Sequence, residues 1–231
     1  MYEMTQFYIN GKWVDPQNPN RAEVINPATG KPCGYISMGS SEDVDIAVAA
    51  AKGAFKNYSK STREDRIELF KSILKILEKR HDDIARAIMH EMGAPWKLAK
   101  DAQAESGPDA FISTLEVLET FDFTERNGTT CIAKEAIGPC ALITPWNWPI
   151  SQVALKVAPA LAAGCTMVLK PSEIAPFDAI IFAEVLDEAG VPAGVFNLVN
   201  GDGPTVGVAL SSHPDIAMIS FTGSTRAGIS V

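Results

Sequence analysis

The sequence has little of what metal and nucleic-acid sites require. It holds only three histidines, and no His, Cys and carboxylate residues stand together at metal-ligand spacing. Lys and Arg number 20 against 28 Asp and Glu, which gives a formal net charge of −8, and no local basic cluster offsets this charge. An acidic surface repels phosphate backbones and anionic lipids. We therefore expect no metal site and no nucleic-acid partner.

Cysteine is also sparse, and the first ten residues have no cationic stretch followed by an apolar run. Without a C-x-x-C pair or a dense cysteine framework, disulfide stapling is not expected. The missing signal pattern argues against secretion. Both absences favour a reducing, cytoplasmic location. The four cysteines are Cys33, Cys131, Cys140 and Cys165.

One uncharged segment, residues 136–155, has the length of a membrane span. Pro139, Pro145 and Pro149 interrupt it. Asn147 would also be left without partners in hydrocarbon. We therefore expect a buried strand, a turn and a core helix here, and no membrane partner.

In the first half of the chain, the spacing of apolar residues mostly predicts helices. Asn10-Gly11 predicts a hairpin over residues 7–14, because both central positions of a type I′ turn need positive φ. Capping boxes at Ser40 and Thr62 begin two helices, and the second continues to Gly93.

Pro95 opens a further helix, which we expect Gly107-Pro108 to interrupt before it ends near Thr120. An alternating, β-branched stretch follows and predicts an extended bridging strand rather than core. The predicted organisation has three parts: a helical N-terminal part over 1–124, a bridging strand over 125–138, and a Rossmann-like core over 139–231.

The second half alternates short apolar strands with helices. Such a rhythm predicts right-handed crossovers and a parallel sheet, so the fold class is α/β with a Rossmann-like, doubly wound sheet. Ligands of such sheets bind at the carboxyl ends of the strands. The predicted strands are 140–144, 166–170, 195–199 and 216–221, and the helices are 151–163, 176–189 and 204–211.

The loops after these strands are rich in functional side chains. Gly223 to Gly228 forms a strand-to-helix turn that suits a pyrophosphate, although a plain helix cap by Ser224 or Thr225 explains it as well. The glycines at 201, 203 and 207 are one position off the dinucleotide fingerprint, and tight turn packing explains them equally.

Lys170 and Glu173 could hold the hydroxyls of a ribose, and a carboxylate there would repel a 2′-phosphate, which favours NAD over NADP. A solvated ion pair is the alternative. Asn147 stands in a stiff loop between Pro145 and Pro149, where its amide suits an oxyanion hole. A buried Asn that satisfies a turn is the commoner role.

Together these segments resemble the aldehyde dehydrogenase superfamily, and the likeness covers almost the whole chain. The resemblance implies NAD-dependent oxidation of a small-molecule aldehyde to a carboxylic acid through a thiohemiacetal and a thioester, with the Asn147 side chain as oxyanion donor. The segments that carry it are Ile9-Asn-Gly-Lys-Trp-Val, Ile25-Asn-Pro-Ala-Thr-Gly, Ile143-Thr-Pro-Trp-Asn-Trp-Pro, Ala162-Ala-Gly-Cys-Thr-Met-Val-Leu-Lys-Pro-Ser-Glu, Gly190-Val-Pro-Ala-Gly-Val-Phe-Asn and Ser220-Phe-Thr-Gly-Ser-Thr.

The resemblance also implies positions for the cofactor and the substrate. The aldehyde tunnel would be lined by Trp148, Gln152 and Leu155, which share one helical face, although ordinary packing remains the alternative for Leu155. The implied NAD contacts are Ile143, Thr144, Pro145, Trp146, Lys170, Ser172, Glu173, Gly203, Gly207, Phe221, Thr222, Gly223 and Ser224.

The family's Gly-Gln-x-Cys nucleophile and Glu-Leu-Gly-Gly base motifs do not occur in these residues. No local cysteine context matches, and we expect Cys165 to be structural. Val231 follows a helix start, so the chain resembles the first half of a family member, with an incomplete sheet. The resemblance implies a homodimer or homotetramer in which residues 125–138 serve as the oligomerisation strand, and it makes residues 139–231 the NAD-binding core. The alternative is a non-catalytic, truncated cofactor-binding or subunit-interaction fragment. The sequence does not distinguish a dehydrogenase that hydrolyses the thioester from an acylating one that passes it to coenzyme A.

Overall fold

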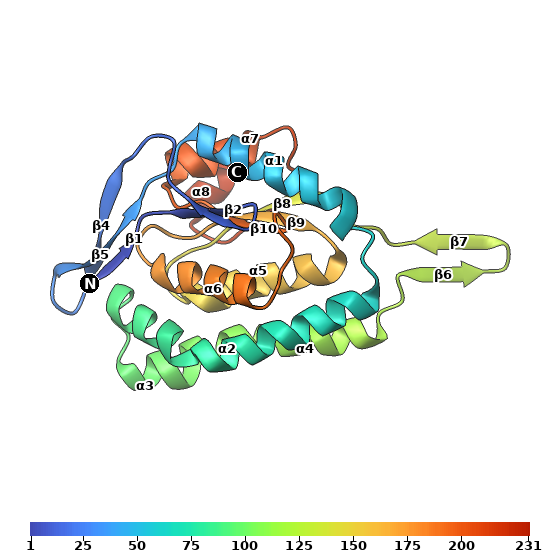
Figure 1. The fold of residues 1–231 in the computed structure, drawn as a ribbon, viewed down its shortest axis with the longest axis horizontal. Coiled ribbons are helices and arrows are strands. Elements are labelled where there is room, and N and C mark those ends of the chain that lie inside the picture. The colour runs from blue at the N-terminus through green and yellow to red at the C-terminus, as the bar shows by residue number, and fades with distance from the viewer.

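A six-stranded sheet forms the centre of the computed structural model, which describes all residues 1–231 (Figure 1). Four of its strands are parallel neighbours, and a hairpin adds two antiparallel strands at one edge. The α/β class and the doubly wound parallel sheet are thus confirmed. In spatial order the strands are β11 (Met218–Phe221), β8 (Pro139–Ile143), β9 (Thr166–Lys170), β10 (Phe196–Leu198), β2 (Phe7–Ile9) and β3 (Lys12–Val14).

Both faces of this sheet are covered by helices. Successive strand residues point to opposite faces, so on β8 Cys140 and Leu142 join one hydrophobic cluster, whereas Ala141 and Ile143 join another. The first cluster lies under α5 (Pro149–Ala163) and α6 (Phe177–Glu188), and α2 (Arg63–Glu91) and α4 (Ser106–Thr120) pack outside them. The second lies under α1 (Ser41–Tyr58), η2 (Gly203–Gly207) and α7 (Val208–Ser212).

Local signals in the sequence set several of these boundaries. Asn10 and Gly11 both have positive φ, at 53° and 72°, and connect β2 to β3 as predicted. Ser40 and Thr62 each form a complete capping box at the start of α1 and α2. These side chains satisfy N–H groups that the first helical turn leaves without partners.

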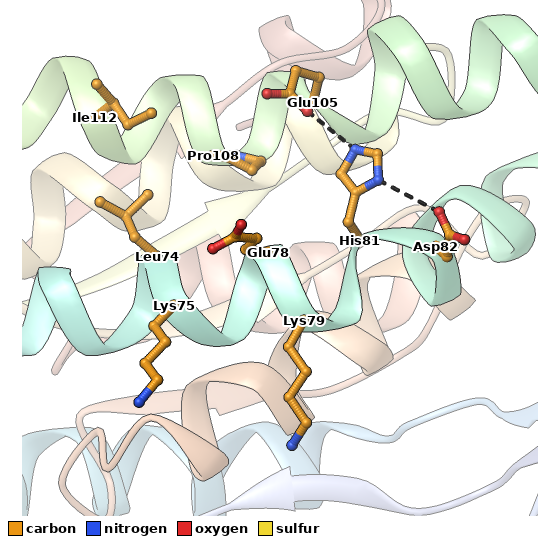
Figure 2. A pocket seen from close by; sticks show the side chains of 9 residues that line it. All are labelled: Leu74, Lys75, Glu78, Lys79, His81, Asp82, Glu105, Pro108 and Ile112. Carbon is orange, nitrogen blue, oxygen red and sulfur yellow. Dashed lines mark ion pairs between the residues drawn. The ribbon is translucent and has the colours of Figure 1, made fainter.

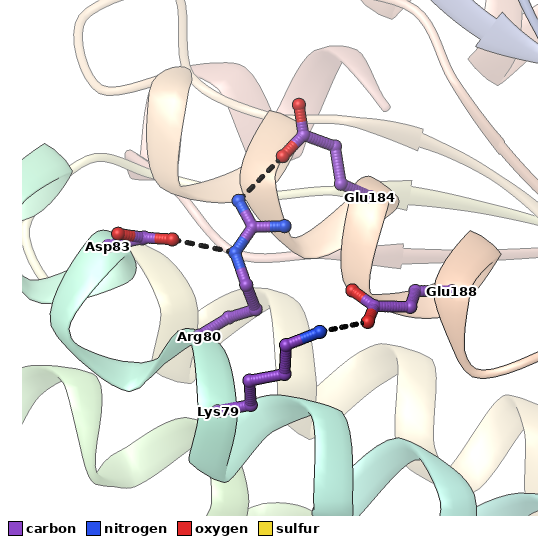
Figure 3. A network of polar contacts seen from close by, with 5 residues as sticks. All are labelled: Lys79, Arg80, Asp83, Glu184 and Glu188. Carbon is purple, nitrogen blue, oxygen red and sulfur yellow. Dashed lines mark hydrogen bonds and ion pairs between the residues drawn. The ribbon is translucent and has the colours of Figure 1, made fainter.

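Ion pairs join the exposed surfaces of α2 and α6 (Figure 3). Arg80 lies 2.7 Å from both Asp83 and Glu184, and Lys79 pairs with Glu188. The carboxylates of these pairs are at least 37% exposed and so are screened by water, and each pair contributes only about 1 kcal/mol or less. They align the two helices, while the apolar core supplies most of the stability.

A buried pair of carboxyl groups makes a second joint between α2 and α6. The Glu91 carboxylate accepts hydrogen bonds from the N–H groups of Phe177, at 2.5 Å, and Asp178, at 2.9 Å. It thereby caps the start of α6. The Asp178 side chain is fully buried beside it. Burial raises the pKa of both groups, that of Glu91 to about 7, so at neutral pH the pair retains a proton.

The helix that begins after Pro95 differs from the prediction. It runs through α3 (Trp96–Leu98) and a π-helical stretch, η1 (Ala99–Ala104), to a turn at Glu105. Gly107-Pro108 does not interrupt it, because both residues lie in the first turn of α4. A proline is tolerated there, since the first N–H groups of a helix have no partner within it.

The predicted bridging strand is a hairpin of β6 (Thr124–Asn127) and β7 (Thr130–Ala133), whose residues are all exposed. It extends away from the body of the protein (Figure 1). A further sheet, absent from the predictions, contains β1 (Tyr2–Met4), β5 (Lys31–Ser37) and β4 (Arg21–Asn26). The chain ends in α8 (Thr225–Ser230).

The largest hydrophobic cluster contains residues from both sides of the hairpin, from Tyr8 to Leu198. Residues 1–124 therefore share a core with residues 139–231, and the threefold division of the chain stays a prediction. No helix in the structure is long and apolar enough to cross a bilayer.

Candidate functional site

The carboxyl ends of the four parallel strands meet at one edge of the sheet. Main-chain hydrogen bonds hold the loops there together. The Thr144 N–H donates to the Lys170 carbonyl at 3.2 Å, and the Thr222 N–H donates to the Ile143 carbonyl at 3.1 Å. The loops after β8, β9 and β11 thus form a connected rim, as the alternating pattern of strands and helices predicted.

Lys170 connects the loops that follow β9 and β10. Its buried ammonium group donates to the carbonyl oxygens of Pro171 and Gly201, both at 2.7 Å, and lies 3.5 Å from a carboxylate oxygen of Glu173. Burial lowers the pKa of Lys170, and the nearby Glu173 carboxylate opposes that shift. The Glu173 side chain is 41% exposed, so the carboxylate keeps access to a ligand from solvent.

A cavity of about 490 Å³ opens between η2, α7 and α8. Four predicted NAD contacts line it: Ile143, Gly203, Gly207 and Phe221. Its size is within the range of small-molecule sites. The Asp202 carboxylate shapes one wall by accepting the Thr205 N–H at 2.7 Å. Sequence reasoning missed Arg226, which also lines the cavity and gives no distinguishing signal in the sequence.

The other predicted cofactor residues lie on the loops of the rim and do not line this cavity. Ser224 accepts the Ala227 N–H at 3.2 Å and so caps α8, and Ser172 accepts the Ile174 N–H at 3.3 Å. A Cβ atom on Gly223 would lie 2.4 Å from the Phe221 ring, so the turn passes close to that ring. The full set outside the lining is Thr144, Pro145, Trp146, Lys170, Ser172, Glu173, Thr222, Gly223 and Ser224.

Asn147 is exposed in the loop between β8 and α5. Its main-chain carbonyl accepts a hydrogen bond from Gln103 Nε2 at 3.4 Å, and its side-chain amide takes part in no hydrogen bond of the chain. The amide therefore does not satisfy the turn, which was the alternative role. Sequence reasoning missed Gln103, although a glutamine four residues after buried Ala99 on a helix is a detectable polar position on an apolar face.

Lys156 links α5 to the end of β11. Its ammonium group donates to Thr222 Oγ1 at 2.7 Å and to Ser220 Oγ at 3.2 Å. Partial burial lowers the pKa of this lysine. The side chain is therefore anchored at the rim and does not extend freely into solvent.

The three predicted tunnel residues lie along one face of α5. The Gln152 N–H donates to the Trp148 carbonyl at 3.0 Å, which confirms their helical spacing. Trp148 and Leu155 are 39% and 57% exposed. None of the three lines the cavity beside η2, and their role in a tunnel stays a prediction.

A larger cavity of about 760 Å³ lies between α2 and α4, away from the rim (Figure 2). Lys75, Lys79, Glu78, Asp82 and Glu105 are among its lining residues, and His81 lies between the two last carboxylates; both lysine side chains point away from Glu105. Because three of its lining residues are carboxylates, which repel a pyrophosphate, this cavity does not match the chemistry of a dinucleotide.

All four cysteines are free thiols. Cys165 is buried at the amino end of β9, whereas the loops described above follow the carboxyl end of that strand. This position separates it from Asn147 and agrees with a structural role. No group of three or more His, Cys or carboxylate residues in the structure could hold a metal ion.

Comparison with known proteins identifies the fold and the family. The aldehyde dehydrogenase family model matches residues 13–231. A 3-succinoylsemialdehyde-pyridine dehydrogenase from a Pseudomonas species is 55% identical over 99% of this chain and 48% of its own length. An aldehyde dehydrogenase from Bartonella henselae superposes with a TM-score of 0.98 at 51% identity, over all of this chain and 49% of its own.

A mutant of aldehyde dehydrogenase C from Pseudomonas syringae, solved with NAD+ and octanal, superposes with a TM-score of 0.96 at 48% identity. That match covers 97% of this chain and 46% of the other. The chain thus spans about half the length of the relatives it matches. The family model matches the sequence from residue 13 onward, and the fold matches over the whole chain. This chain therefore belongs to the aldehyde dehydrogenase family.

Proposed function

We propose that the protein oxidises a small-molecule aldehyde to a carboxylic acid with NAD, and that residues 1–231 supply the cofactor site and the oxyanion donor. The observation that carries this proposal is the position of Asn147. Its side-chain amide is unbonded on a loop of the same rim that carries the cavity beside η2. The comparison with a relative solved with NAD+ and octanal supports both the cofactor and the aldehyde class.

The residues of the rim fit a dinucleotide. Gly203 and Gly207 present main chain without side chains at the cavity wall, which lets a flat ring approach closely. The half-exposed Glu173 carboxylate would accept hydrogen bonds from a ribose diol and would repel a 2′-phosphate, so NAD is preferred over NADP. When bound, NAD would accept the hydride from the substrate.

Lys170 would act mainly as a support for this ribose site. Its three ammonium hydrogens face two carbonyl oxygens and Glu173, so it fixes the carboxylate and the loop after β10 relative to each other. Ser224, the α8 turn and Arg226 would face the anionic part of the cofactor.

Asn147 would donate its side-chain N–H to the oxygen that becomes negative when a thiolate attacks the aldehyde. Pro145 and Pro149 restrict the loop, which lowers the cost of holding that donor in place. The thiolate and the water-activating glutamate follow from the family resemblance, and none of the four cysteines here occupies their motif.

The exposed hairpin β6–β7 would join neighbouring subunits in a homodimer or homotetramer. Its outer strand edges are unpaired and Ile132 is 51% exposed, which suits pairing with another chain. The free thiols favour a reducing, cytoplasmic location. The aldehyde channel would pass over the exposed face of α5 that carries Trp148, Gln152 and Leu155.

The test is aldehyde-dependent formation of NADH, followed by absorbance, with the protein purified at the length at which it occurs in the cell. Aliphatic and aromatic aldehydes are compared, with and without coenzyme A, and each with NAD and NADP. We expect turnover with NAD. Binding of NAD without turnover on any aldehyde would contradict the proposed oxidation and favour a non-catalytic cofactor-binding module.

A further inference from the structure

Gln103 makes an unusual contact with the loop that carries Asn147. It lies on the π-helical stretch η1 and is 1% exposed. Its Nε2 atom donates to the main-chain carbonyl of Asn147 at 3.4 Å and lies 3.2 Å from Met92 Sδ. A buried amide is costly unless it is hydrogen-bonded, so the position of Gln103 calls for an explanation beyond packing.

The segment that carries Gln103 contacts α2 close to both of its ends (Figure 2 shows one of the contacts). Lys100 pairs with Asp82 at 2.8 Å, and Glu105 lies 3.1 Å from His81 Nε2. A π-helical turn is rare and costs hydrogen-bond geometry, and such turns occur often at functional sites. Here the stretch packs against α2, and this packing places Gln103 beside the Asn147 loop.

The neighbouring helix α4 also approaches the loop closely. A Cβ atom on Gly107 would lie 3.0 Å from Ile150 Cγ1, and Ile150 lies in the first turn of α5, directly after the loop. The loop is thus anchored to the α3–η1–α4 segment at its exit by close packing and near its centre by a hydrogen bond. These are two independent contacts from one segment.

We propose that Gln103 is a positioning residue that fixes the main chain at Asn147, so that the Asn147 amide faces the developing oxyanion. This inference rests on the proposed function of Asn147. Gln103 does not touch the substrate. It acts through the carbonyl of Asn147, whose orientation sets the direction in which the side chain leaves the loop.

The variant Gln103→Met tests the inference, because it keeps the length of the side chain and removes the donor. A misplacement of a catalytic group by about 1 Å costs on the order of 100-fold in rate. We expect kcat to fall about 10- to 100-fold, with KM for the aldehyde and Kd for NAD unchanged within about twofold. Amide hydrogen exchange over residues 145–148 should become faster.

Gln103→Asn is the second variant, since it keeps the amide but is one methylene too short for the contact; it should reproduce the loss. Ser106→Ala is the matched control. The Ser106 hydroxyl donates to the Gln103 carbonyl at 2.6 Å on the same segment without touching the loop, so this variant should keep both the rate and the exchange of the natural protein.

A double variant separates this inference from the function on which it rests. In an Asn147→Ala background, Gln103→Met should cause no further loss of kcat, because the two residues act as one unit. Full activity of Asn147→Ala would refute the proposed role of Asn147 itself. Unchanged kcat and unchanged loop exchange in a folded Gln103→Met protein, or equal losses in Ser106→Ala, would overturn the positioning role.

Discussion

The variant Lys170→Met should destabilise the fold at the rim of the sheet. The substitution keeps most of the apolar stem of the side chain and removes the ammonium group that binds the carbonyls of Pro171 and Gly201 at 2.7 Å. A hydrogen bond to a charged group contributes roughly 1.5 to 3 kcal/mol, and the desolvation of the buried ammonium offsets part of the sum. We expect a net loss of about 2 to 4 kcal/mol.

For a chain of this size, such a loss lowers the melting temperature by roughly 5 to 15 °C. The assay is thermal unfolding followed by circular dichroism at pH 7. Glu173→Gln is the matched control, because the Glu173 side chain is 41% exposed and lies 3.5 Å from the ammonium group. Loss of the Glu173 charge should lower the free energy of unfolding by less than about 1 kcal/mol. A Lys170→Met melting temperature within about 2 °C of the natural protein would refute the support role of Lys170.

Three further variants test other parts of the account. Asn147→Ala should lower kcat about 100- to 1,000-fold with NAD affinity retained, and unchanged steady-state turnover would remove Asn147 from the reaction. Glu173→Gln should reduce the preference for NAD over NADP in a binding titration. An unchanged ratio of the two dissociation constants would contradict the proposed contact between Glu173 and the ribose hydroxyls. Asp178→Asn should raise the melting temperature at pH 8 and flatten its pH dependence. Because burial and the adjacent Glu91 raise the pKa of Asp178 well above its usual value, the natural protein loses stability as pH rises through the range in which Asp178 ionises, and equal pH profiles for the two proteins would contradict the shared proton.

The features that the sequence predicted well depend on local signals. Asn10-Gly11 needs positive φ at both positions, and Ser40 and Thr62 bind N–H groups only three residues away. The alternation of apolar strands with helices brought four loops to one edge of the sheet. Ile143 and Phe221 could therefore be expected at one site, although 77 residues of sequence lie between them.

The features that were missed depend on contacts between distant segments. Gln103 reaches the Asn147 loop from another helix, and Arg226 faces the cavity only because α8 folds beside η2. Gly107-Pro108 looked like a break because a proline is costly inside a helix, but the π-helical pattern gives way to an α-helical one at Glu105, where the backbone stays helical with φ of −63° and ψ of −31°.

The hairpin over residues 124–133 did have a local signal. Asn127-Gly128 is the same dipeptide that predicted the first hairpin, and Gly128 has φ of 60°. The alternating stretch predicted only one extended strand, because the polar residues of β6 carry no apolar alternation. The β1–β5–β4 sheet lacked such a signal, because the pairing of β1 with β5 joins segments about 30 residues apart in a parallel register.

The most direct test of the central claim is a crystal structure of the protein grown with saturating NAD+. The cofactor should occupy the cavity lined by Gly203, Gly207 and Phe221. Its adenosine ribose hydroxyls should lie within hydrogen-bond distance of the Glu173 carboxylate. A cofactor bound elsewhere on the chain, or a well-ordered rim without bound NAD+ at saturation, would contradict the central claim.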